Sequence, residues 1–66
     1  MTEMGFSPGE FTSRGGLFHW EGKGNGDIVL WDENESKALL WLTTEQARTM
    51  KDQLYLLIDM AEHGDL

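Results

Sequence analysis

The 66-residue sequence contains no cysteine and only one proline. Without cysteine, the chain can form no disulfide bond, no thiolate nucleophile and no cysteine-based zinc or iron–sulfur site. A chain of this length buries only about 60% of the surface that its unfolded form exposes, so we expect a single, marginally stable domain. Small domains without disulfides or metals commonly gain stability by oligomerising or by docking on a partner. The missing cysteines therefore favour a protein that associates with another chain.

The sequence is also poor in basic residues and has no long apolar run. Twelve acidic residues against five basic ones give a net charge of −7, which repels nucleic-acid phosphates and anionic membrane surfaces. No run approaches the roughly 20 apolar residues of a membrane-spanning helix, and residues 1–16 lack the basic and apolar blocks of a signal peptide. We therefore expect a cytoplasmic protein that contacts neither nucleic acid nor membrane directly.

Motifs for catalysis or cofactor binding are missing as well. The two histidines, His19 and His63, do not have the spacing of a zinc site. The glycine-rich segment 22–26 does not match a phosphate-binding pattern, and an EF-hand loop that starts at Asp32 would place Lys37 where such a loop needs glycine. No serine lies in a nucleophile elbow. The sequence therefore predicts no enzymatic activity, no cofactor and no metal.

The residues that are present predict a small α+β domain over residues 17–66. Residues 1–16, rich in Gly, Ser and Thr, are interpreted as a flexible arm or an edge strand. Three runs enriched in aromatic and aliphatic residues follow, at 17–21, 27–32 and 36–42, and turn-forming residues separate them. This order predicts a three-stranded antiparallel meander with a possible extra N-terminal edge strand.

A helix is expected at about residues 44–62. Thr43 and Gln46 fit a capping box, in which each side chain bonds to the backbone amide of the other residue. Apolar residues then recur at three- and four-residue intervals, which places them on one face of a helix. This apolar stripe comprises Ala47, Met50, Leu54, Leu57, Ile58 and Ala61. The sequence thus predicts an amphipathic helix packed on one face of the sheet.

Side chains alternate across a strand, so the strand register divides the apolar residues between two faces. Leu42 precedes the helix cap and is expected to face the helix. Short loops would then pair Leu30 with Ala38 and Trp20 with Ile28. The expected helix-facing layer is Phe18, Trp20, Ile28, Leu30, Ala38, Leu40 and Leu42.

The opposite face of the sheet, called the outer face below, has no second helix to cover it. Exposed apolar patches often mark interaction sites, and tryptophan is enriched among interface hot spots. The predicted interface combines six residues of the outer face with two on the helix: Leu17, His19, Val29, Trp31, Leu39, Trp41, Leu56 and Met60. In an alternative interpretation, the N-terminal arm crosses the outer face and packs Phe6 and Phe11 on Trp31 and Trp41.

The leading hypothesis is a non-enzymatic interaction module that binds another protein chain through the outer face, as a homodimer or larger homo-oligomer or by modulating a cellular protein. A phage-encoded modulator of host machinery would be one example, although no motif establishes that origin. The alternative is an acidic nucleic-acid mimic, in which Glu45, Asp52 and Asp59 lie about 10.5 Å apart along one side of the helix and occupy the basic groove of a DNA- or RNA-binding protein. A third possibility is a module that binds a peptide at the sheet edge.

Overall fold

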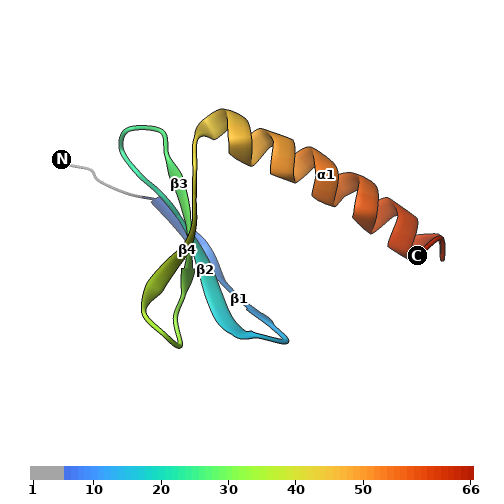
Figure 1. Cartoon of the computed structure of the whole chain (residues 1–66), viewed down its shortest axis with the longest axis horizontal. Coiled ribbons are helices and arrows are strands. Elements are labelled where there is room, and N and C mark those ends of the chain that lie inside the picture. The colour runs from blue at the N-terminus through green and yellow to red at the C-terminus, as the bar shows by residue number, and fades with distance from the viewer. Residues whose placement is uncertain (1–5) are drawn as a thin grey trace.

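The computed structural model describes residues 6–66, which form one sheet and one helix (Figure 1). The elements are β1 (Phe6–Ser13), β2 (Gly16–Gly22), β3 (Ile28–Asp32), β4 (Lys37–Leu42) and α1 (Thr44–Glu62). Neighbouring strands pair antiparallel in the order β1-β2-β3-β4. The α+β class is confirmed, and the possible N-terminal edge strand is present, so the meander has four strands.

β1 forms one edge of the sheet and pairs with β2. Phe11 lies opposite Phe18, and the two ring centroids are 5.8 Å apart. This contact lies on the side of the sheet that faces α1. Phe11 therefore does not pack on Trp31 or Trp41, as the alternative interpretation required, and the side chain of Phe6 lies outside the described residues.

The register between β2 and β3 differs from the predicted one. Trp20 lies opposite Leu30 rather than Ile28. The connecting loop has the expected five residues, at 23–27, but it begins one residue later, and a backbone hydrogen bond of 2.8 Å between its first and last residues closes it. The shift amounts to two residues, so each side chain stays on its predicted face.

The turn between β3 and β4 has four residues, 33–36, rather than the predicted three. The buried Asp32 carboxylate accepts hydrogen bonds from the amides of Asn34 (2.8 Å) and Glu35 (3.2 Å). Ser36 has a φ angle of 54°, in the left-handed region that residues other than glycine rarely adopt. Asp32 therefore fixes the turn and, with it, the start of β4.

The longer turn adds one residue before β4 relative to the predicted register, and a β-bulge at Leu39 adds another within the strand. Leu30 lies opposite Leu40, whereas the next residue, Trp31, lies opposite Ala38, which leaves Leu39 without a partner. Because the turn and the bulge together shift the register by two residues, Leu40 keeps its predicted face. Ala38 lies between the turn and the bulge, so its register is shifted by only one residue and its side chain changes face. The prediction that Ala38 faces the helix is therefore wrong.

α1 has the predicted bounds and the predicted cap. The Gln46 amide donates a hydrogen bond to Thr43 Oγ1 (3.1 Å), and the Thr43 amide donates one to Gln46 Oε1 (3.0 Å). The Thr44 hydroxyl also donates to the carbonyl of Gly26 (2.6 Å). This last bond ties the start of the helix to the loop between β2 and β3.

α1 packs against the sheet only at its first turns and then extends away from it. β4 is the strand that α1 approaches most closely, and Figure 1 shows the helix leaving the end of β4 at an angle and ending far from the strands. The radius of gyration is 13.7 Å, whereas a compact domain of this length has about 11 Å. The expected two-layer core is thus incomplete. Among the described residues, Val29 is the one fully buried hydrophobic side chain.

Because the capping box fixes the start of α1, we predict that Thr43→Ala lowers the free energy of unfolding by about 1 kcal/mol, as measured by urea denaturation followed by circular dichroism. Thr49→Ala is the matched control. Thr49 bonds only to the carbonyl of Glu45 within the helix (3.2 Å), and alanine has the higher helix propensity. Equal losses in the two variants would contradict the role of the cap.

Candidate protein interface

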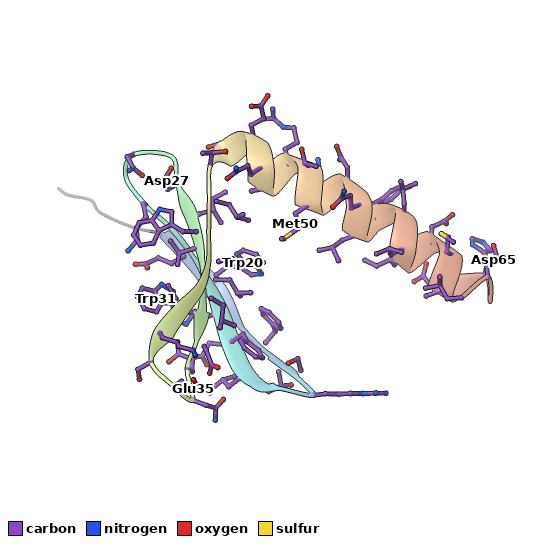
Figure 2. All side chains as sticks on the ribbon, in the orientation of Figure 1. Trp20, Asp27, Trp31, Glu35, Met50 and Asp65 are labelled. Carbon is purple, nitrogen blue, oxygen red and sulfur yellow. The ribbon has the colours of Figure 1, made fainter. Side chains whose placement is uncertain are left out.

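An apolar groove lies between the sheet and α1, with a volume of about 480 Å³. The sheet contributes Trp20, Ile28 and Leu42 to its lining, and the helix contributes Ala47, Met50, Lys51, Leu54, Tyr55 and Ile58. Figure 2 shows Trp20 on the helix side of the sheet and Met50 on the sheet side of the helix. Lys51 is the single charged residue of this lining, so the groove is suited to an apolar ligand or polypeptide.

The apolar stripe of α1 is exposed over the second half of the helix. Leu54 and Leu57 each expose 48% of their surface, Ile58 exposes 54%, and the neighbouring Tyr55 exposes 70%. Full burial of one such side chain stabilises a protein by about 1.5–3 kcal/mol. Because these side chains are already about half buried, covering the rest of several of them would contribute a few kcal/mol, which is a large fraction of the stability of a small domain. The stripe is therefore the part of the described chain where burial of exposed apolar surface would stabilise the protein most.

The outer face, in contrast, is partly covered by side chains of the sheet itself, although Trp41 exposes 57% of its surface. Val29 has no exposed surface, and its cross-strand neighbours are Glu21 and Trp41. The Trp31 indole N–H donates to Glu21 Oε1 (2.8 Å). Lys23 Nζ lies 5.8 Å and 5.6 Å from the ring centroids of Trp31 and Trp41, and 2.9 Å from Glu21 Oε1. Glu21 and Lys23 thus cover aromatic surface that the sequence analysis expected to be bare.

His19 and Asp27 complete this polar and aromatic cluster. The His19 ring stacks on Trp31, with centroids 6.3 Å apart, and contacts the Glu33 carboxylate. Asp27 Oδ2 accepts a hydrogen bond from the Trp41 indole N–H (2.9 Å). Figure 2 shows Trp31 on the side of the sheet away from α1. Both indole donors of the outer face are therefore satisfied within one chain.

The residues predicted as an interface differ widely in exposure. Val29 is buried, Leu17, His19 and Trp31 are half-buried, and Leu39, Trp41, Leu56 and Met60 are exposed. Their contact with a partner stays a prediction. The groove was not predicted as a binding surface, because the apolar stripe of α1 was expected to lie in a closed core. The amphipathic pattern of α1 does indicate that its apolar stripe packs against another surface. It does not indicate whether that surface belongs to the same chain or to a partner.

The acidic stripe of the mimic hypothesis, Glu45, Asp52 and Asp59, is exposed along α1. A lysine lies beside one of its members, since Lys51 Nζ is 3.6 Å from Asp52, and the His63 ring lies beside another, with Nδ1 3.4 Å from Asp59. The stripe therefore resembles the mixed, solvated charge of an ordinary helix surface more than a row of phosphates.

Across residues 6–66, no three His, Asp or Glu side chains come together in a way that could hold a metal ion. The same part of the chain contains no helix with the length and apolar character needed to cross a membrane. Comparisons of the chain with protein-family models, with curated proteins and with solved structures found no match. Function is therefore inferred from the surface itself.

Hydrogen bonds from Lys23 and Trp31 hold the pKa of Glu21 below its ordinary value. A carboxyl whose pKa is lower in the folded chain stabilises the fold above its unfolded pKa, and that contribution is lost as the pH falls through the folded pKa. We predict that Glu21→Gln lowers the melting temperature at neutral pH. The difference from wild type should shrink as the pH falls below about 4.

The matched control is Glu10→Gln, because Glu10 is exposed on the edge strand β1. Its melting temperature should follow that of the wild type at each pH. A loss in the Glu21 variant that is as large at acidic as at neutral pH would show that the carboxylate charge does not stabilise the outer face.

Proposed function

We propose that this chain is a non-enzymatic protein–protein interaction module that binds another polypeptide in the groove between its sheet and α1. One observation supports this above all: the 19-residue helix has no buried residue, and its apolar stripe stands open beside an apolar sheet face. Contiguous exposed apolar surface of this kind usually marks an interaction site on a globular protein.

The lining suits recognition of a helix or an extended segment. In helix-in-groove binding, apolar anchors at three- and four-residue intervals fill an apolar groove. Trp20 and Tyr55 belong to the residue types that dominate interface hot spots, and Met50 has a flexible side chain that adapts to different partner shapes. Lys51 adds one positive charge at the border, which would orient an acidic group of the bound polypeptide.

The outer face lies on the side of the sheet opposite the groove. Its indole donors are satisfied and Val29 is enclosed, so contacts on this face stabilise the sheet that carries Trp20 and Ile28 on its other side. Leu39 and Trp41 remain exposed there and are a smaller, second surface on which the predicted outer-face contact would rest. The nucleic-acid mimic has less support, since Lys51 lies beside Asp52 and the His63 ring lies beside Asp59.

A photoactivatable residue in the groove tests this proposal in cells that express the full chain. We predict that such a residue at position 58 crosslinks to a polypeptide, whereas one at position 49 does not. Ile58 lines the groove, and Thr49 lies nine positions away in sequence, which places it about 180° around the helix. The products are sized by gel electrophoresis and identified by mass spectrometry.

A crosslinked polypeptide at position 58 alone supports the proposal, whether its mass is that of this chain or of another. Products at neither position, or in equal amounts at both, would overturn it.

A further inference from the structure

We infer that the groove is filled by α1 of a second copy of this chain, in a symmetric dimer whose two α1 helices run antiparallel. The inference rests on the proposed function, because it requires that the groove binds a polypeptide, and it identifies that polypeptide. Three observations carry it: the order of charges along α1, the match between the helix and the groove, and the amount of surface left uncovered.

Five residues of α1 form a line beside the apolar stripe, called the charged edge below. They are Arg48, Lys51, Tyr55, Asp59 and Glu62. Successive members are three, four, four and three positions apart, which keeps them within about 80° of one another around the helix. Lys51 and Tyr55 line the groove, so the charged edge runs along its border. Both bases precede the central tyrosine and both acids follow it.

This order of charges is complementary to itself when two helices run antiparallel. Arg48 and Glu62 are each seven positions from Tyr55, and Lys51 and Asp59 are each four positions from it. A two-fold axis beside Tyr55 therefore brings the bases of each helix opposite the acids of the other. A parallel pair would instead place like charges together, which is unfavourable.

The charged groups of this edge make few ion pairs within one chain. Among the ion pairs of residues 6–66, Arg48 and Glu62 take no part, and Lys51 and Asp59 make only exposed contacts, of 3.6 Å with Asp52 and 3.4 Å with His63. Exposed pairs of this kind contribute little to stability. The four groups are therefore available to a second helix.

The apolar surfaces match in the same arrangement. Leu54 and Ile58 line the groove, and in a second copy the same side chains form the ridge of apolar anchors that such a groove accepts. A two-fold contact is isologous, so it covers helix and sheet face in both copies at once. The net charge of −7 opposes this little, because Lys51 is the one charged residue of the lining and distant surface charges are screened beyond about 8 Å at physiological salt.

The chain exposes more surface than a compact protein of its mass. A compact protein of 7.5 kDa exposes about 4,200 Å², whereas this chain exposes 5056 Å². The excess is several hundred Å², and each partner in an interface of standard size contributes about 800 Å². Two copies that cover each other's grooves would therefore gain the compactness that one copy lacks.

A charge exchange on the purified full chain tests the inference, with mass measured by light scattering over a wide concentration range. The wild type should reach twice the 7.5 kDa of one chain. We predict that Arg48→Glu with Lys51→Glu, and separately Asp59→Lys with Glu62→Lys, each raise the dimer dissociation constant about a hundredfold, because four attractive pairs become repulsive. All four changes together restore complementarity and should restore the dimer.

The design contains its own controls. The variant with all four changes has the wild-type net charge of −7, so its recovery cannot come from net charge. Each double variant moves acids toward the helix N-terminus or bases toward the C-terminus, which favours an isolated helix. Loss of the dimer would then not reflect a melted helix, and circular dichroism of each variant checks this.

A wild-type dimer that both double variants weaken and the fourfold variant restores supports the inference. A wild-type monomer at every concentration overturns it, as does a dimer that neither double variant weakens or a fourfold variant that stays monomeric. The crosslinking experiment separates the two proposals. If position 58 crosslinks only to a protein of another mass while the purified chain is monomeric, the interaction function stands and the self-association fails.

Discussion

The junction between β4 and α1 determines where the apolar surface of this chain lies. Thr43 and Gln46 cap the helix reciprocally, and the Thr44 hydroxyl bonds to the Gly26 carbonyl in the adjacent loop. These bonds fix the direction in which the helix leaves the sheet. Because only the first turns of α1 remain near β4, every later member of the apolar stripe is left in solvent, and the groove opens between the helix and the strands.

The two faces of the sheet consequently have different roles. On the outer face, Glu21 and Asp27 accept the indole hydrogen bonds of the two tryptophans and Lys23 lies near both rings, although Trp41 still exposes 57% of its surface. On the other face, the groove and the apolar stripe of α1 stay open in the described chain. Segments with few buried contacts open at the lowest free energy, and a ligand that binds only the folded form stabilises it. Under the proposed function, binding in the groove would therefore stabilise the second half of α1.

The sequence was sufficient to predict features that depend on local chemistry. The capping box and the apolar periodicity located α1, and the alternation of side chains assigned Leu40 and Trp31 to opposite faces although the register was wrong by two residues. Ala38 was assigned incorrectly because its position depends on the turn fixed by Asp32 and on the bulge beside Leu39. Neither feature has a signal in the hydrophobic pattern.

The angle of α1 could not be predicted, because an amphipathic stripe looks the same whether it covers its own sheet or another chain. The charged edge is more informative. Its order places Arg48 toward the N-terminus and Glu62 in the last turn, where no basic residue accompanies it. Glu62, in the last turn, is unfavourable toward the helix dipole by about 0.3–1 kcal/mol, whereas Arg48 lies beyond the first turn and is little affected. An isolated helix gains nothing from this order, and the described part of the chain offers no ion pair to Arg48 or Glu62 that would compensate for it. A second, antiparallel helix presents the opposite order at the same positions, and it would convert the unfavourable arrangement into four attractive contacts.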